Sequence, residues 1–348
     1  MSDERKLRFG IVGLGNIAAT HAKAIQSLKD AELTAACSRS DANRRKFSES
    51  FDVPVYHSCI ELLSQTALEA VVICTPSGTH LDYGKLAAEA GKHVIVEKPI
   101  EVTTARGKEL IECCKLNGVE LAVIYQNRFL DGAVKMKNAV QNGSIGEPVM
   151  VRAAVKWFRD VAYYQNSGWR GTHKMDGGGA VINQAIHTID LLLWIMGDIH
   201  GLSAIKGTLT HPGIETEDNA VAIMKFMNGA MGVFEASTSI VPAQPRFIEV
   251  NGTKGTALLQ DDRFVLLSDE ENQASDTPKE TGGSGAADPL AGMHAALHAR
   301  QYSQIVEAIL SNQIPQVSGE DALRSLAVAE AIYRSANKQK FVEPFENI

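Results

Sequence analysis

The chain has 348 residues, a formal net charge of −7, and 45% hydrophobic and 22% charged residues. These values are ordinary for a globular enzyme, and the length has room for two domains. An acidic chain without a block of Lys or Arg is a poor match to a protein that binds nucleic acid or anionic membrane surfaces. No apolar run approaches the ~20 residues of a transmembrane helix, so we expect neither nucleic acid nor a membrane as a partner.

The N-terminus and the cysteines predict the compartment. The first residues are charged and lack the apolar core of a signal peptide, which predicts a cytoplasmic protein. An odd number of cysteines suits a reducing compartment better than a disulfide framework, and their spacing does not match a zinc site. We therefore expect no metal site, and structural thiols at all five positions: Cys37, Cys59, Cys74, Cys113 and Cys114.

The first predicted strand, Leu7–Val12, leads through a glycine-rich turn into a predicted helix at 19–28. The turn Gly13–Ala18 has the G-x-G-x-x-A form of a dinucleotide-binding fingerprint. Its first glycine permits a tight turn, and its second lets the main chain approach a pyrophosphate. A plain strand-to-helix turn is the alternative, because glycines are common at such junctions. The fingerprint predicts four cofactor-binding residues: Gly13, Gly15, Asn16 and Ile17.

The end of the second predicted strand, Glu32–Cys37, indicates which cofactor is bound. A carboxylate at this place usually binds the ribose of NAD, but here Ser38 and Arg39 follow and Asp41 comes too late. A hydroxyl and a guanidinium suit a 2′-phosphate, so Ser38 and Arg39 favour NADP over NAD. The alternative is that Arg39 stacks on the adenine and that either cofactor is accepted.

The third predicted strand, Ala70–Cys74, ends in small residues that leave room for a ligand. Thr75 and Pro76 follow it directly and are predicted to contact the cofactor. His80 could reach the ribose or pyrophosphate of the cofactor, or it could cap the helix predicted at 81–90.

The fourth predicted strand, His93–Val96, ends in Glu97, Lys98 and Pro99. Ligands of an open parallel sheet bind beyond the carboxyl ends of its strands, so Lys98 points toward a ligand-binding crevice. Pro99 would fix the turn that presents Lys98, and a cis Lys98–Pro99 bond is one way to do so.

A helix at 104–116 and a strand at 121–124 complete the first predicted domain, residues 1–125. The alternation of strands and helices predicts a doubly wound parallel sheet, the Rossmann arrangement. Gln126, just beyond it, is a further predicted cofactor contact.

Residues 126–348 form the second predicted domain, an α+β domain with a large, mostly antiparallel open sheet. A helix at 131–142 and a strand at 149–157 are followed, beyond residue 200, by a series of β runs. Residues 269–286 are expected to be a surface loop. Helices are predicted at 289–310 and 319–336, and we expect His294, His298 and Arg300 to be solvated rather than to reach a site.

A glycine triplet, 177–179, leads into a helix predicted at 180–196. Asn183, His187 and Asp190 are spaced by four and three residues and therefore share one face of this otherwise apolar helix. Buried polar groups need partners. One interpretation is a buried network in which His187 bonds to Asp190. The other is that the polar face lines the same crevice as Lys98.

Together these motifs resemble the Gfo/Idh/MocA family (glucose–fructose oxidoreductase, inositol dehydrogenase, MocA) over nearly the whole chain. The resemblance rests on the Gly13–Ala18 turn, on Thr75-Pro76 with His80, on Glu97-Lys98-Pro99 and on His187 with Asp190. It implies a Rossmann domain, bound NAD or NADP, and a homodimer or homotetramer packed through the second sheet. It also implies redox chemistry on a secondary alcohol of a sugar, inositol or nucleotide sugar.

The sequence departs from many members at Asn183, where they carry Asp. An amide cannot take up a proton at neutral pH, so a carboxylate relay through this position is in doubt. Asn183 is similar to the UDP-N-acetylglucosaminuronate 3-dehydrogenase branch, as are Tyr163-Tyr164 and the segment Gly168–Thr172.

Further substrate contacts are predicted around these motifs. Arg128 and Arg170 could grip a carboxylate or phosphate, or each could pair with a structural Asp. Trp169 could stack on a sugar, cover the nicotinamide or pack in the core. Asp190 belongs to the same predicted substrate-binding set.

The mechanism we infer moves a hydride between the nicotinamide and a carbinol carbon. His187 is the predicted acid/base, and Lys98 polarises the substrate oxygen as an ammonium, although the two roles could be reversed. Asn183 would orient the hydroxyl and Glu97 would anchor the nicotinamide ribose. Two alternatives are a glycoside-processing enzyme that uses tightly bound NAD transiently, and a non-catalytic nicotinamide-binding regulator.

Overall fold

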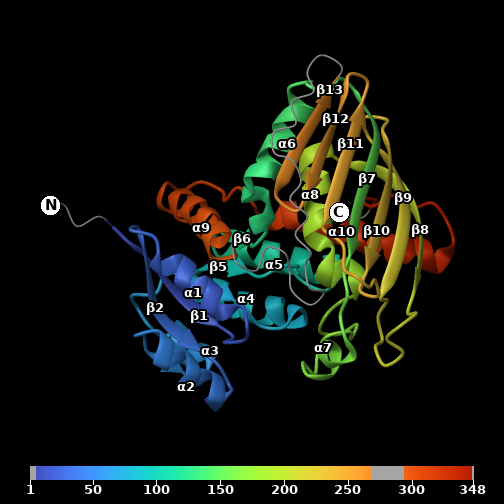
Figure 1. The fold of residues 1–348 in the computed structure, drawn as a ribbon. Helices are drawn as coiled ribbons and strands as arrows, with labels where there is room; N and C mark the ends of the chain where they lie inside the picture. Colours follow the sequence, from blue (N-terminus) through green and yellow to red (C-terminus); the bar gives the residue numbers. More distant parts are fainter. Residues whose placement is uncertain (1–4, 269–293, 347–348) are drawn as a thin grey trace. The chain divides into compact units, whose positions relative to one another are not determined.

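The computed structural model describes residues 5–268 and 294–346, which form two compact units (Figure 1). Unit 1 contains the described residues of Met1–Gln126 and Gly292–Leu323, and unit 2 contains those of Asn127–Ala291 and Arg324–Ile348. The loop predicted at 269–286 and the start of the helix predicted at 289–310 lie outside the described residues. No helix among the described residues combines the length and the apolar character needed to cross a membrane.

Unit 1 is built on a six-stranded parallel sheet of order β3-β2-β1-β4-β5-β6. The order reverses between β1 and β4, which is the switch point at which doubly wound sheets bind ligands. The predicted Rossmann arrangement is therefore confirmed. Its strands are β1 (Leu7–Val12), β2 (Ala31–Cys37), β3 (Val55–Tyr56), β4 (Ala70–Ile73), β5 (His93–Val96) and β6 (Leu121–Val123).

Serine or threonine side chains begin three helices of unit 1. Ser40, Ser58 and Thr103 each accept a hydrogen bond from a main-chain N–H in the first turn of the following helix. The helices of unit 1 are α1 (Ala18–Gln26), α2 (Asp41–Ser50), α3 (Cys59–Leu63), α4 (His80–Glu89), α5 (Thr104–Leu116) and α9 (His294–Leu310), with a 3₁₀ turn η1 (Ser77–Thr79).

Helix α9 comes late in the sequence but belongs to unit 1, so the predicted division into 1–125 and 126–348 differs from the observed one. The helix packs against α1. Tyr302 and Ile305 of α9 lie in one buried core with Phe9 of β1 and Ile25 of α1. The burial of this apolar face explains why α9 belongs to unit 1. Exposing the face to water would lose ~25 cal/mol of stabilising free energy for each Å² of apolar surface.

Unit 2 is built on a seven-stranded sheet of order β13-β12-β11-β7-β10-β9-β8. Its β7–β10 pair is parallel and its other pairs are antiparallel, which confirms the predicted mostly antiparallel sheet. The strands are β7 (Pro148–Lys156), β8 (Ile199–Gly207), β9 (Asn219–Phe226), β10 (Met231–Ser237), β11 (Phe247–Gly252), β12 (Gly255–Gln260) and β13 (Arg263–Ser268).

Helices cover one face of this sheet. α6 contacts β12 and β13, and α8 contacts β7. The helical segments of this part of the chain are η2 (Gln126–Phe129), α6 (Asp131–Gln141), α7 (Val161–Gln165), the π-helix η3 (Ala180–Gln184) and α8 (Ile186–Met196). α10 (Gly319–Lys338) belongs to unit 1 as far as Leu323 and to unit 2 from Arg324.

Candidate functional site

The turn between β1 and α1 has a conformation that requires glycine. Gly13 has a φ of +93°, and a Cβ there would lie 2.8 Å from Cγ2 of Thr75 and 2.9 Å from the carbonyl carbon of Cys74. The Gly13 N–H donates to the Cys37 carbonyl at 3.0 Å. Gly15 is exposed, and a Cβ there would meet nothing within 4 Å. The carboxyl ends of β1, β2 and β4 thus meet beside a main chain that a ligand can approach.

The other residues of this turn are also accessible. Asn16 is exposed, and Ile17 is partly exposed at the N-cap of α1. The first N–H groups of a helix favour an anion. The Thr79 hydroxyl donates to the Pro76 carbonyl at 2.7 Å, and its oxygen lies 2.8 Å from that of the Thr75 hydroxyl. The turn after β4 is therefore held by its own side chains.

The end of β2 carries no acidic side chain available to a ribose. Arg39 is exposed. Asp41 forms an ion pair with Arg44, whose guanidinium also donates to the Ser38 carbonyl at 2.7 Å. The Ser38 hydroxyl accepts the main-chain N–H of Ser40 at 3.2 Å. Arg39 is thus the exposed cation at the place where the sequence predicts contact with the cofactor ribose.

His80 does not cap α4, and its contact with the cofactor stays a prediction. Its side chain is buried, with Nδ1 2.9 Å from the Pro99 carbonyl and Nε2 3.0 Å from the Thr75 carbonyl. The imidazole thus lies between two main-chain carbonyl oxygens. It ties the turn after β4 to the turn after β5.

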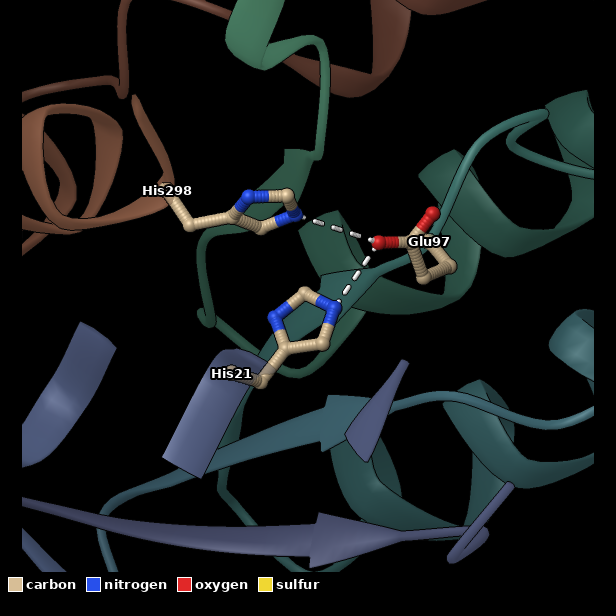
Figure 2. A group of neighbouring side chains, drawn as sticks. All are labelled: His21, Glu97 and His298. Atoms are coloured by element: carbon tan, nitrogen blue, oxygen red, sulfur yellow. Dashed lines mark hydrogen bonds and ion pairs between the residues drawn. The ribbon is translucent and has the colours of Figure 1, made fainter. Parts of the chain in front are cut away.

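Lys98 is partly exposed beyond the carboxyl end of β5, and the Lys98–Pro99 peptide bond is cis, as the sequence analysis anticipated. The role of Glu97 at the cofactor ribose stays a prediction, and the structure shows contacts of its carboxylate with the protein. Its Oε1 lies 2.8 Å from Nε2 of His21 and 3.7 Å from Nε2 of His298 (Figure 2). Its Oε2 accepts the main-chain N–H of Lys98 at 3.1 Å. The carboxylate is therefore committed to the protein.

His298 and His21 are two buried imidazoles that form a cluster with the partly buried Glu97. His298 was predicted to be solvated, but it is fully buried on α9, and His21 is fully buried on α1. One atom from each of the three residues lies within 4.8 Å of the other two, a grouping that could hold a metal ion. No spacing in the sequence joins these residues, because three separate elements bring them together.

The environment favours the charged form of Glu97 and the neutral form of His21. Burial alone would raise the pKa of Glu97, but the hydrogen bond from His21 and the neighbouring His298 imidazole outweigh it and hold this pKa well below its ordinary value. Burial lowers the pKa of His21, although Glu97 opposes the shift. At neutral pH the pair is thus a carboxylate and a neutral imidazole.

In unit 2, the glycine triplet packs too closely for side chains. A Cβ at Gly178 would lie 2.1 Å from the Tyr333 hydroxyl, and one at Gly179 would lie 1.8 Å from the Glu217 carbonyl oxygen. The buried Glu217 carboxylate accepts the N–H of Gly179 at 3.2 Å and that of Val181 at 2.9 Å. Burial raises its pKa. These contacts replace a regular helix start.

The helix predicted at 180–196 is divided into η3 and α8, with a break at Ala185. Asn183 lies before the break, and His187 lies in the first turn after it. Both are partly exposed, whereas Asp190 is fully buried. Of the two interpretations of this polar face, the one in which it lines a crevice therefore does not extend to Asp190.

Asp190 and Arg128 are not available to a substrate, which corrects their predicted role. The Arg128 guanidinium donates two hydrogen bonds to the Asp190 carboxylate, at 2.8 and 2.7 Å, and both side chains are buried. Ser325 donates a third at 3.1 Å. The pairing of Arg128 with a structural Asp, which the sequence analysis left open, therefore applies.

Asn183 is held by neighbouring side chains. Its amide nitrogen donates to buried Asp176, and its oxygen accepts from the Tyr163 hydroxyl at 3.2 Å and from the Gln184 amide at 2.6 Å. Asp176 also accepts the N–H of Gly171 at 2.8 Å. The role of Asp176 was missed, because nothing in the sequence marks it as a partner of Asn183.

Aromatic rings and a guanidinium gather beside Asn183. Arg170 lies 4.2 Å from the ring centre of Tyr163 and 5.4 Å from that of Trp169, and all three side chains are partly exposed. Arg170 also donates to the Tyr163 carbonyl at 3.4 Å. The predicted substrate contacts Trp169 and Arg170 thus belong to one cationic, aromatic surface.

Gln126 is buried, and its side-chain oxygen has no hydrogen-bond partner among the described residues. A buried acceptor without a partner is costly. Together with the open main chain at Gly15, this acceptor gives unit 1 two features that fit a bound dinucleotide.

The whole chain matches one family of dehydrogenases. Residues 7–125 match the model of the Gfo/Idh/MocA oxidoreductase family described as its NAD-binding Rossmann fold, and residues 137–343 match its C-terminal alpha/beta domain. The chain therefore belongs to the Gfo/Idh/MocA oxidoreductase family, and it is an enzyme of the sugar and polyol dehydrogenase type.

Named relatives extend over nearly the full length. The chain is 28% identical to myo-inositol 2-dehydrogenase of Thermotoga maritima, over 97% of this chain and 98% of that protein. It is 31% identical to the WlbA dehydrogenase of Bordetella pertussis, whose crystal structure holds NADH and UDP-GlcNAcA. That similarity covers 97% of this chain and 99% of the other, with a TM-score of 0.86. A WlbA dehydrogenase of Chromobacterium violaceum is 30% identical, over 99% and 97% of the two chains and with the same TM-score.

Proposed function

We propose that this enzyme transfers a hydride between a nicotinamide cofactor and a secondary alcohol of a sugar, inositol or nucleotide sugar. One observation carries the proposal. Lys98 stands partly exposed beyond the carboxyl end of β5, in the turn that follows the NAD-binding sheet of a sugar and polyol dehydrogenase. That edge of a doubly wound sheet is where ligands bind.

The cofactor, when bound, supplies or accepts the hydride. Gly13, Gly15, Asn16 and Ile17 would hold its pyrophosphate, since their turn has an open main chain and a helix N-terminus. Thr75 and Pro76 would border it from the turn after β4. The Gln126 oxygen would accept a hydrogen bond from the bound cofactor.

The alcohol requires a proton acceptor and a group that stabilises negative charge on its oxygen. We assign the first role to His187, because an imidazole titrates near neutral pH. Lys98, as an ammonium, would donate a hydrogen bond to the same oxygen. Asn183, held by Asp176 and Tyr163, would orient the hydroxyl.

Within this substrate class, the surface formed by Trp169, Arg170 and Tyr163 favours a nucleotide sugar that carries an acidic group. Arg170 offers a planar set of donors for a carboxylate or phosphate, and the rings offer stacking faces. The bound UDP-GlcNAcA of the similar WlbA structures is a compound of this kind.

The test is a panel of sugars, inositols and UDP-sugars, each with NAD⁺ and NADP⁺, followed by the absorbance band of reduced nicotinamide. We expect net formation of reduced cofactor with at least one secondary alcohol, and the highest kcat/KM with an acidic UDP-sugar. A protein that retains cofactor on purification but shows no net reduction with any compound would contradict hydride transfer to free cofactor.

Arg39 is proposed to favour NADP over NAD. Replacing it by Ala should lower kcat/KM with NADP⁺ by about tenfold or more and change that with NAD⁺ little, because a charge-assisted contact to the 2′-phosphate is lost. Arg45→Ala is the control, since Arg45 is another exposed arginine on the helix that follows. Equal losses with both cofactors would show that Arg39 contacts the adenine instead.

We also propose that the enzyme is a homodimer or homotetramer packed through the uncovered face of the second sheet. Alternate residues of β9 point outward, and Val221 and Ile223 are 42% and 60% exposed. Met231 on the neighbouring strand β10 is 57% exposed. A contiguous exposed apolar patch is typical of an interface between chains.

Ile223→Glu should therefore lower the assembled mass measured by light scattering, because a carboxylate would be buried in the interface without a partner. Leu116→Glu is the control, since Leu116 is 85% exposed on α5 of unit 1. A monomeric native protein, or an Ile223→Glu protein of unchanged mass, would contradict the proposal.

A further inference from the structure

A chain of hydrogen bonds leads from the interior of unit 1 to the main chain of Lys98. The Tyr302 hydroxyl lies 2.8 Å from Nδ1 of His21, and Nε2 of the same ring lies 2.8 Å from Oε1 of Glu97. The other Glu97 oxygen accepts the Lys98 N–H at 3.1 Å. Three residues thus connect helix α9 to the turn that presents Lys98.

The groups have the protonation states that such a chain requires. Burial raises the pKa of Tyr302 well above its ordinary value, so the phenol stays protonated and can donate a hydrogen bond to Nδ1 of His21. The neutral His21 then carries its own proton on Nε2, where the Glu97 carboxylate accepts it. Each donor in this chain of hydrogen bonds therefore faces an acceptor. The Tyr302 hydroxyl faces Nδ1 of His21, the Nε2–H of His21 faces Oε1 of Glu97, and the Lys98 N–H faces Oε2 of Glu97.

Packing fixes the geometry of these side chains. His21 and Tyr302 are fully buried, with ring centres 5.8 Å apart at 88°. His298 packs edge-on against His21 at 4.9 Å and adds a second imidazole beside Oε1 of Glu97 (Figure 2). The Glu97 carboxylate is 14% exposed, and if it rotated it would lose at least one of these hydrogen bonds beside buried partners, where the loss is costly.

We propose that His21, Tyr302 and His298 are positioning residues that act through Glu97 to fix the main chain of Lys98 in its active geometry. This inference rests on the proposed catalytic role of Lys98. Nε2 of His21 and Oε1 of Glu97 are 2.8 Å apart, which is an ordinary N–H···O distance. A direct hydrogen bond is therefore sufficient to explain this contact.

The first test is the tautomer of His21, read from the nitrogen chemical shifts of ¹⁵N-histidine in the whole protein. We expect the Nε2–H form in the native protein. In Glu97→Gln, the amide can keep its oxygen toward Lys98 only by turning its NH₂ toward His21, so the ring should change to the Nδ1–H form. A native His21 that is doubly protonated or in the Nδ1–H form overturns the inference, as does one equivalent of divalent metal bound at the cluster.

The second test is the exchange rate of the Lys98 amide hydrogen, which requires no catalytic activity. Tyr302→Phe preserves the ring and removes only the hydroxyl. We expect exchange at Lys98 to become about fivefold faster, the change that corresponds to the loss of one buried hydrogen bond of ~1 kcal/mol from the chain. The control is His93→Gln, because His93 lies at the opposite end of β5 and accepts the Glu120 N–H. Unchanged exchange at Lys98 in Tyr302→Phe overturns the inference.

The third test is kinetic. Tyr302→Phe and Glu97→Gln should lower kcat by about 10- to 100-fold, the loss expected when a reacting group is slightly misplaced, and in Tyr302→Phe the cofactor Kd should stay the same. His93→Gln should leave kcat unchanged. Normal kcat in both variants overturns the inference. If the native enzyme transfers no hydride at all, the proposed function fails, and the tautomer and exchange measurements still decide whether the chain holds the Lys98 turn.

Discussion

Replacement of Lys98 by Met is expected to lower kcat by about 10²- to 10⁴-fold and to leave cofactor affinity nearly unchanged. Methionine keeps the length and apolar stem of lysine and removes only the ammonium. The substrate oxygen would then lose the donor that stabilises its negative charge. Steady-state kinetics with the preferred sugar gives kcat, and fluorescence titration gives the cofactor Kd.

Lys92→Met is the matched control, because Lys92 immediately precedes the same strand and its Nζ donates to the Leu68 carbonyl at 2.7 Å. It should leave kcat within a factor of about two. His187→Ala should cost as much as Lys98→Met and should remove one limb of the pH dependence of kcat/KM. Near-normal kcat in both Lys98→Met and His187→Ala would contradict the assignment of the two roles.

Asp190→Ala is expected to destabilise the protein by about 3–5 kcal/mol, the usual cost of breaking a buried ion pair from one side. Arg128 is 5% exposed and would keep its charge without the carboxylate that now accepts two of its hydrogen bonds. Unfolding in guanidinium chloride, followed by circular dichroism, measures the change.

Two further variants test whether the loss of stability is specific to the buried ion pair. Asp198→Ala breaks the exposed pair with Arg324, whose side chains are 46% and 37% exposed, and should cost only about 0–1 kcal/mol. The double variant Arg128→Met/Asp190→Leu removes both buried charges and should recover most of the stability lost in Asp190→Ala. If Asp190→Ala costs no more than Asp198→Ala, the buried pair does not stabilise unit 2 as we infer.

Local patterns in the sequence were sufficient to predict the nucleotide-binding sheet. Strand Leu7–Val12 and helix Thr104–Leu116 have the bounds that apolar periodicity and neighbouring turn residues predict. The same holds for the position of Lys98 at a strand end, since this depends only on strand His93–Val96 and on the parallel topology.

Contacts between distant segments could not be predicted in this way. Asp190 has the spacing of an accessible polar face, but its burial depends on Arg128 and Ser325, which lie elsewhere in the chain. His298 has the local sequence of a solvated helix position, and its burial follows from the packing of α9 against α1. The start of η3 is bound by Glu217, a residue of another segment, through the N–H groups of Gly179 and Val181.

The place of α9 in unit 1 has a consequence for the order in which the protein folds. A nascent chain that has been made only as far as Gln126 contains every strand of the six-stranded sheet but lacks Tyr302, Ile305 and the rest of the α9 core face. The nucleotide-binding unit must wait for nearly the whole polypeptide before its interior is closed, although its strands are synthesised first. A chimera that transfers cofactor binding to another substrate domain must likewise transfer two separate stretches of sequence.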